Sequence, residues 1–154
     1  MSIGFITGCT QQSENNEEPD HTPVKYSEFV NWSVNTSKVI YGQLSVLERY
    51  WENESWDECL SRISYYKSQI STFVNKALVY NLQGTLDLAR SEFIKWLNTI
   101  TQVYEDWELA LHNFIAGDNQ TGNGYAQSGQ TLLDNAQEYA KNCGEYITEW
   151  LNEE

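Results

Sequence analysis

The sequence predicts an all-α protein, folded as an antiparallel up-down-up-down four-helix bundle. Two observations favour this class. The 154 residues include only two prolines and nine glycines, and they contain no alternating β-branched runs of the kind that form strands. After residue 22, three turn-forming stretches separate four segments of similar length, in which apolar residues recur every three or four positions. Such segments can bury their apolar faces only against one another.

The first predicted helix covers residues 23–52. Thr22 followed by Pro23 fits an N-cap and then proline at the first helical position, where a missing N–H costs nothing. The chain then breaks at Asn53-Glu54. The predicted buried stripe combines apolar residues with two serines: Tyr26, Val30, Ser33, Ser37, Ile40, Leu44, Leu47 and Trp51.

The second predicted helix covers residues 55–82. Ser55 and Glu58 have the spacing of a capping box, and Gly84 is expected to be the C′ glycine that ends the helix. Its stripe steps alternately by four and three residues: Cys59, Ile63, Tyr66, Ile70, Phe73, Ala77 and Tyr80.

The third and fourth predicted helices cover residues 85–116 and 124–152. Residues 117–124 separate them and form the most turn-rich stretch of the chain, which predicts its longest loop. The third helix has the most regular stripe: Leu86, Ala89, Phe93, Trp96, Ile100, Val103, Trp107, Ala110 and Phe114. The stripe of the fourth helix is Tyr125, Gly129, Leu132, Ala136, Tyr139, Cys143, Tyr146 and Trp150.

Short connections make neighbouring helices antiparallel, and stripes of this spacing suit the small crossing angle of bundle packing. A helical-repeat solenoid is disfavoured because the segments share no repeat signature, whereas an extended pair of helical hairpins remains an alternative. In the bundle, Cys59 and Cys143 lie on the order of 20 Å apart along the axis. A disulfide requires Cα atoms within about 7 Å, so two free, packed thiols are predicted.

Residues 1–22 differ from the rest of the chain. A short apolar stretch in residues 1–9 ends at a cysteine, and the polar, acidic residues 10–22 predict a disordered tether. Ile6-Thr7-Gly8-Cys9 resembles the lipobox of prokaryotic lipoproteins. The resemblance implies that residues 1–9 end a signal peptide whose start lies upstream of Met1. It also implies that Cys9 carries a lipid and that the bundle lies in the cell envelope, outside the cytoplasmic membrane. The alternative is an incidental cysteine in a cytoplasmic protein.

The charge of the chain argues against two classes of partner, nucleic acid and anionic lipid. Nine Lys and Arg residues against 22 Asp and Glu give a net charge of −13, which argues against nucleic acid because phosphate binding needs basic side chains. Five acidic residues are expected at the bundle end opposite the tether: Glu52, Glu54, Asp57, Glu58 and Asp118. They form either a solvated helix end or a recognition surface for a basic partner or divalent cations.

No catalytic, metal-binding or cofactor-binding residues are expected. A di-iron bundle needs repeated Glu and His ligands, whereas Glu108 and His112 form a single i, i+4 pair that is interpreted as a solvated helix-face contact. Asn53 and Asn119 begin glycosylation acceptor patterns and fall in predicted loops.

The functional hypothesis is a non-enzymatic, lipid-anchored helical bundle that binds a protein or cell-envelope partner. A small ligand is a variant, because small stripe residues could leave space among bulky aromatics: Ser33, Ser37, Ala89, Gly129 and Ala136. The alternative hypothesis is a cytoplasmic helical adaptor or chaperone-like module.

Overall fold

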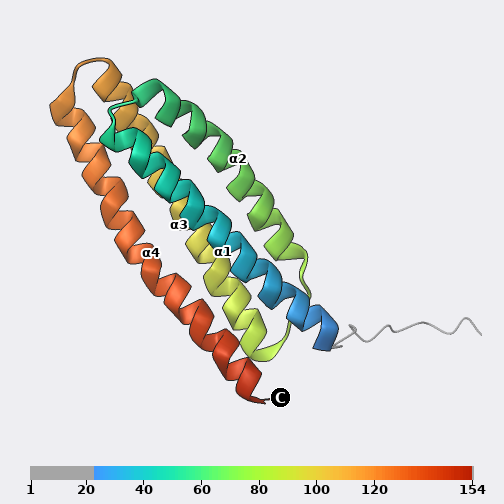
Figure 1. The fold of residues 1–154 in the computed structure, drawn as a ribbon. Helices are drawn as coiled ribbons and strands as arrows, with labels where there is room; N and C mark the ends of the chain where they lie inside the picture. Colours follow the sequence, from blue (N-terminus) through green and yellow to red (C-terminus); the bar gives the residue numbers. More distant parts are fainter. Residues whose placement is uncertain (1–22, 154) are drawn as a thin grey trace, which may run out of the picture.

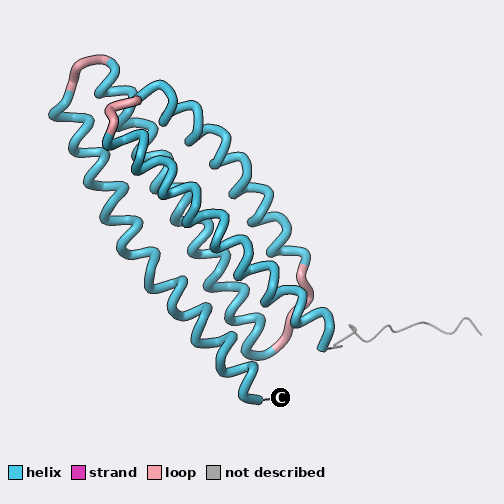
Figure 2. The backbone as a smooth tube through the Cα atoms, in the orientation of Figure 1, coloured by secondary structure: helices cyan, strands magenta, loops and turns pink. Residues whose placement is uncertain are grey.

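The computed structural model describes residues 23–153, which form four helices and no strand within that range (Figures 1 and 2). The helices are α1 (Pro23–Glu52), α2 (Trp56–Val79), α3 (Gly84–Ile115) and α4 (Asn119–Glu153). Consecutive helices run in opposite directions along one long axis, as Figure 1 shows, so the four-helix bundle is confirmed. None of the four described helices contains an apolar stretch that is long enough to cross a membrane. The predicted signal remnant, the tether and Cys9 lie outside the described residues.

The connection between α2 and α3 differs from the prediction. The second helix ends at Val79 instead of residue 82, and Gly84 is the first residue of α3 instead of a C′ stop. Tyr80 adopts an extended backbone, with φ −69° and ψ 121°, and its ring packs on Phe29 and Trp32 at centroid distances of 5.3 and 5.5 Å. The C-cap of α2 is therefore Tyr80, an extended residue whose ring packs on α1, and not a left-handed glycine.

The predicted loop over residues 117–124 is also wrong, because α4 already begins at Asn119. The Asp118 carboxylate accepts a hydrogen bond from the Thr121 N–H at 3.1 Å, which caps the new helix. This hydrogen bond lowers the pKa of the Asp118 carboxyl group. Gly122 lies inside α4, where a Cβ would come within 2.6 Å of the Phe114 ring. Glycine at this position therefore allows α4 to pack closely on Phe114, although the composition of residues 117–124 predicted a turn.

Two hydrogen-bonded turns close the bundle at the end where α1 and α3 finish. At the end of α1, the Ser55 N–H bonds to the Tyr50 carbonyl at 2.9 Å and the Glu54 N–H bonds to the Trp51 carbonyl at 3.0 Å. This is the Schellman pattern, with Glu54 at the left-handed C′ position and φ 54°. The capping box predicted at Ser55 does not form, since its side chain makes no cap hydrogen bond.

The end of α3 has the same pattern with a glycine at C′. The Asp118 N–H bonds to the Asn113 carbonyl at 2.9 Å and the Gly117 N–H bonds to the Phe114 carbonyl at 3.0 Å. Gly117 has φ 82°. Glycine adopts this conformation without the steric cost that a side chain adds.

We expect Glu54→Gly to raise the free energy of unfolding by about 1 kcal/mol, because it removes a Cβ from a left-handed position. The reverse change, Gly117→Ala, should lower it by about 1–2 kcal/mol for the same reason; no atom lies within 4 Å of its added Cβ, so clashes do not contribute. Urea unfolding followed by circular dichroism measures both. Equal signs for the two variants would contradict this interpretation of the turns.

The core follows the predicted stripes on α2 and α3. On α4 it follows the predicted stripe except at Tyr125, which is exposed, and on α1 the stripe is displaced. The buried residues of α1 are Phe29, Ser33, Thr36, Ile40, Gln43 and Leu47. The predicted members Tyr26, Val30, Leu44 and Trp51 are only partly buried against the core. The sequence pattern missed this face because two of its members, Thr36 and Gln43, are polar.

A hydrogen-bond network explains why Gln43 is buried. The Tyr104 hydroxyl donates to Gln43 Oε1 at 3.1 Å, and Gln43 Nε2 donates to Gln69 Oε1 at 2.7 Å. Gln69 in turn donates to the Tyr65 hydroxyl at 3.1 Å. The network joins α3, α1 and α2. Burial raises the pKa of the Tyr104 hydroxyl above its usual value, which keeps it a hydrogen-bond donor.

The backbones of α3 and α4 lie close together over more of their length than those of any other pair of helices in the bundle. Small side chains at intervals of seven residues face α3 from α4 and are buried: Gly122, Gly129, Ala136 and Cys143. At Gly129, a Cβ would lie 2.5 Å from the indole of Trp107 and 3.3 Å from the Val103 carbonyl oxygen. By contrast, α1 makes few close backbone contacts with α4.

Cys59 and Cys143 are both free and buried, so the predicted pair of unbonded thiols is confirmed. Burial raises the pKa of the Cys59 thiol to about 11. The pKa of Cys143 rises to about 12, through burial and the nearby negative charge of Glu92. Because the thiolate is the reactive form, both thiols should be inert at neutral pH.

Candidate functional site: a groove between the first and last helices

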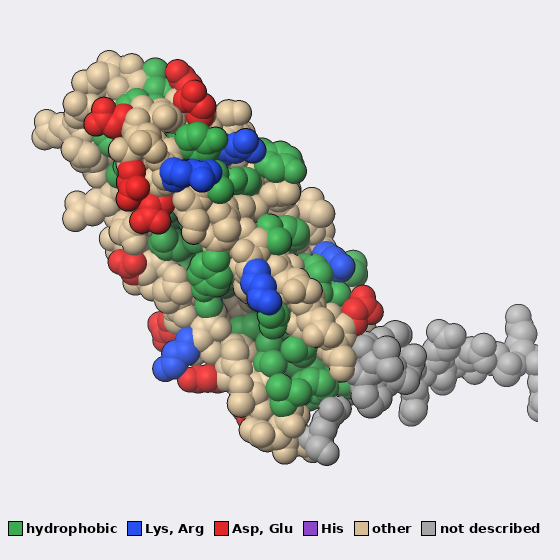
Figure 3. All heavy atoms as spheres, in the orientation of Figure 1, with side chains coloured by type: hydrophobic (Ala, Val, Ile, Leu, Met, Phe, Trp, Pro, Cys, Tyr) green, Lys and Arg blue, Asp and Glu red, His purple; other side chains and the backbone are tan. Residues whose placement is uncertain are grey.

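An open groove separates α1 from α4 in the half of the bundle where α1 ends. It has a volume of about 610 Å³. The wide separation of these two helices creates it, because α4 lies against α3 through glycines and alanine and has few close contacts with α1. Figure 3 shows the α1 face of the bundle, where hydrophobic side chains are exposed along its length and acidic side chains gather toward the upper end and the α4 side.

Three helices contribute to the groove. α1 provides one wall and part of the floor, α4 provides the other wall, and α3 contributes one floor residue. The α1 residues are Tyr41, Leu44, Ser45, Leu47, Glu48, Trp51 and Glu52, the α3 residue is Trp107, and the α4 residues are Ala126, Gln130 and Leu133. The lining therefore combines an apolar and aromatic base with a polar edge, a combination typical of ligand pockets.

The aromatic floor is held in place by other rings. Trp51 lies edge-on to Trp56 and to Phe114, each at a centroid distance of 5.6 Å, and Trp107 lies 6.1 Å from Trp51. The indole of Trp107 occupies the space above Gly129. Close packing of α4 on α3 thus fixes the position of a groove residue.

Two carboxylates, Glu48 and Glu52, lie at the edge of the groove, one helical turn apart on α1. The eleven lining residues include no lysine or arginine. Within residues 26–153, neither carboxylate has a hydrogen-bond or ion-pair partner. The groove therefore presents negative charge beside an aromatic surface.

Tyr41 closes the end of the groove that lies nearer the middle of the bundle. Its hydroxyl reaches across the gap between α1 and α4 to Gln137 Oε1, at 3.4 Å, and its ring lies 5.8 Å from that of Trp96. A separate, smaller cavity of about 120 Å³ lies farther from the α1–α2 turn, between α1, α3 and α4. This cavity is lined by Ser33, Val34, Ser37, Phe93, Trp96, Ala140, Cys143, Gly144 and Ile147. The buried Trp96 indole N–H has no hydrogen-bond partner.

The space expected beside small stripe residues exists only in part. Ser33 and Ser37 line the smaller cavity, whereas the Trp107 indole fills the space at Gly129. Ala89 and Ala136 are fully buried and line neither cavity.

The five acidic residues expected at one end are all exposed. Glu52, Glu54, Asp57 and Glu58 surround the α1–α2 turn, and Asp118 lies in the α3–α4 turn; Figure 1 places both turns at the same end of the bundle. Glu52 also borders the groove, whereas Asp118 caps α4. Of the two expected glycosylation acceptors, Asn53 is in a turn, but Asn119 is the first residue of α4.

No group of three or more metal-ligating side chains occurs in the part of the chain that the structure describes. The expected contact between Glu108 and His112 does not form. Instead, Glu108 accepts from Lys67 of α2 at 2.8 Å, and His112 is exposed. Glu108 therefore contributes to packing between α2 and α3.

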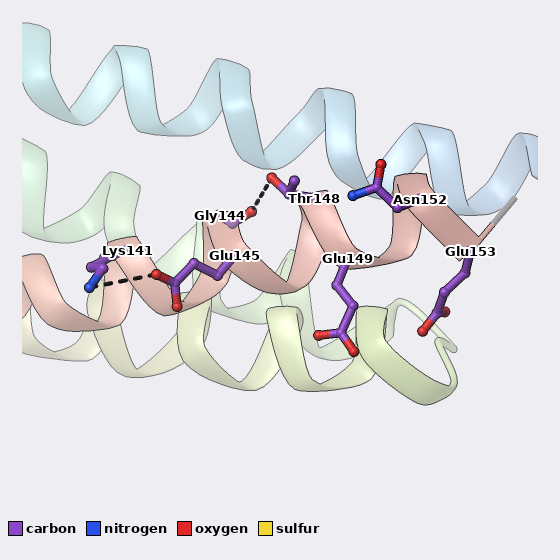
Figure 4. Close-up of a pocket in the computed structure, with 7 residues that line it drawn as sticks. All are labelled: Lys141, Gly144, Glu145, Thr148, Glu149, Asn152 and Glu153. Atoms are coloured by element: carbon purple, nitrogen blue, oxygen red, sulfur yellow. Dashed lines mark hydrogen bonds and ion pairs between the residues drawn. The ribbon is translucent and has the colours of Figure 1, made fainter.

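A second surface, on the outer side of α4, has no binding geometry. Figure 4 shows the seven residues that line it, which all belong to α4: Lys141, Gly144, Glu145, Thr148, Glu149, Asn152 and Glu153. Lys141 pairs with Glu145 at 3.6 Å, and the Thr148 hydroxyl bonds to the Gly144 carbonyl oxygen at 2.9 Å. These are contacts between successive helical turns, and no other helix contributes a lining residue.

Sequence reasoning missed the groove. It assigned Trp51 and Trp107 to the core, and it singled out neither Tyr41 nor Glu48. The sequence did contain one signal, the small residues that recur on α4 at intervals of seven. Such a series indicates that α4 packs tightly against a single neighbouring helix. Because α4 then lies close to α3, a gap is left between α4 and α1.

Comparisons with protein families, with curated proteins and with solved structures found no match to this chain.

Proposed function

We propose that the chain is a lipid-anchored, extracytoplasmic binding protein whose groove between α1 and α4 takes a small amphipathic molecule. The groove is the observation that carries this proposal. Its volume of about 610 Å³ lies within the range of about 300–1,000 Å³ that is usual for ligand pockets. Trp51, Trp107 and Leu47 offer an apolar base, and Gln130 and Ser45 offer hydrogen-bonding groups at the edge.

The limited length of the groove favours a small molecule over a partner helix. Its α1 residues extend from Tyr41 to Glu52, a span of about 17 Å at 1.5 Å per residue. The bridge between Tyr41 and Gln137 closes one end. A docked helix would require an uninterrupted trough between α1 and α4.

The anchoring part of the proposal rests on Ile6-Thr7-Gly8-Cys9. The end at which α1 begins also contains the α2–α3 turn and the end of α4 (Figure 1). Leu78 and Val79 are 59% and 79% exposed beside that turn, which suits proximity to a lipid surface. The groove lies toward the opposite end, so an anchor at Cys9 would leave it accessible.

Ligand binding is tested by titrating the full chain with 4-phenylbutanol, a neutral amphipathic probe, while recording the six indole N–H signals by NMR. We expect binding on the order of 1 mM, as ligand efficiency predicts for a molecule of this size, with shifts concentrated at Trp51 and Trp107. Ala126→Phe should fill the groove and remove the shifts.

The matched control for groove filling is Gln127→Phe, which adds the same ring at the next, exposed position of α4. This variant should bind the probe as the parent does. Shifts spread equally over Trp32 and Trp150, or binding that survives Ala126→Phe, would refute the groove as the site.

Anchoring is tested separately by expression in a bacterium with the native upstream coding sequence. Cys9→Ser should move the protein from the membrane to the soluble fraction, and the intact mass of the parent should include the lipid. Cys143→Ala is the control, because it removes a buried thiol and leaves Cys9 in place. An unmodified parent mass would rule out the anchor and leave the binding proposal intact.

A further inference from the structure

Resting on the proposed binding function, we infer that the groove selects an organic cation, an amine with an alkyl or aryl body, over neutral and anionic molecules of the same shape. The inference comes from the charge of the lining. Glu48 and Glu52 are the charged residues among the eleven that line the groove. Both are without partners within the described residues, so neither charge is neutralised by a neighbouring cation.

The position of the two carboxylates relative to the aromatic floor defines how such a ligand would bind. Glu48 and Glu52 are four residues apart on α1, and Trp51 lies between them in the sequence and contributes to the floor. An ammonium group at the edge can contact the carboxylates while its apolar body lies on Trp51 and Trp107. Indole faces also attract cations directly.

The negative charge around the groove also favours a cationic ligand. The chain has a net charge of −13, and Glu54, Asp57 and Glu58 lie just beyond the groove at the α1–α2 turn. Such a field draws cations toward the site and repels anions, and the effect weakens as salt increases. An anionic ligand would place its charge beside two carboxylates that have no counter-ion among the described residues.

The experiment compares 4-phenylbutylamine with 4-phenylbutanol, two probes with the same body, by the same NMR titration of the full chain. The amine should bind about tenfold more tightly, since exposed ion pairs and cation–π contacts each contribute modestly. In Glu48→Gln/Glu52→Gln this preference should disappear, while the affinity for the alcohol stays as in the parent.

A charge-matched control separates the groove from the general field. Glu105→Gln/Glu149→Gln removes the same number of charges from exposed positions outside the groove, and it should keep most of the preference for the amine. Raising the salt from 20 to 500 mM should reduce the preference in the parent.

The outcomes distinguish the inference from the function on which it rests. If the amine and the alcohol bind equally at Trp51 and Trp107, the groove binds ligands but the charge selectivity is refuted. If the control pair removes the preference as completely as the groove pair, the selectivity belongs to the overall field and the inference also fails. If neither probe shifts these indoles, the proposed binding function itself is overturned.

Discussion

Replacement of Gly129 by alanine is expected to lower the free energy of unfolding by about 1–3 kcal/mol, the usual cost of overpacking. This is the opposite of the usual effect in a helix, where alanine is favoured over glycine by about 1 kcal/mol. The reason is steric. The new Cβ would lie 2.5 Å from the Trp107 indole and 3.3 Å from the Val103 carbonyl oxygen, so α4 must move away from α3 or the indole must turn.

Gly144→Ala is the matched control for this substitution. Gly144 lies on the same helix, and no atom outside the local backbone lies within 4 Å of its added Cβ, so the variant should gain about 1 kcal/mol from helix propensity. Urea unfolding of both variants gives the comparison. Stabilisation in both would show that α4 tolerates a side chain at Gly129, contrary to the tight packing against α3.

The same substitution also tests the origin of the groove. Because Trp107 forms part of its floor, displacement of the indole by Gly129→Ala should weaken binding of 4-phenylbutanol and shift the Trp107 indole N–H signal. Gly144→Ala should leave both unchanged. Unaltered binding in a destabilised Gly129→Ala protein would mean that the groove does not depend on close α3–α4 packing.

The fold could be predicted because the apolar periodicity extends through whole helices. In α3, Leu86, Ala89, Phe93, Trp96 and Ile100 recur at intervals of three or four and are all buried. Such a stripe determines which face packs inward, whatever the details of the neighbouring helix.

Helix ends were less predictable because tertiary contacts override local preference. Gly122 and Gly124 suggested a loop, yet both are helical, and Gly122 is required by the approach of Phe114. Conversely, Glu54 occupies a left-handed position that composition would assign to glycine. Turn propensity identifies residues that can form a loop, but close packing uses some of the same residues.

The groove could not be predicted because it depends on distances between helices. Trp51 and Trp107 have the spacing of core residues, and both do pack against the core. Whether their outer edges meet a fourth helix depends on how closely α4 approaches α3, which Gly122 and Gly129 determine. Apolar periodicity predicts which face of a helix points toward the core, but it does not predict the distance from that face to the neighbouring helix.

The buried network around Gln43 leads to the second large effect. Gln43→Leu should lower the free energy of unfolding by about 1–3 kcal/mol, because it leaves the buried Tyr104 hydroxyl without its acceptor. Tyr104 is fully buried and Gln43 is only 4% exposed, so water cannot replace the lost partner without opening the core. Tyr104→Phe should have a cost of the same order, since it leaves Gln43 Oε1 unpaired.

The double variant Gln43→Leu/Tyr104→Phe separates the value of the hydrogen bond from the penalty of an unpaired group. It removes both polar partners, so its loss should be smaller than the sum of the single losses by about 1–3 kcal/mol.

Gln69→Ala is the control, because Gln69 is half-buried and Gln43 keeps its bond to Tyr104. The loss of stability in Gln69→Ala should be smaller than that in Gln43→Leu. Strictly additive losses, measured by urea unfolding, would show that Gln43 and Tyr104 act independently. A double variant as stable as the parent would show instead that this hydrogen-bonded pair adds no net stability over apolar residues of similar shape.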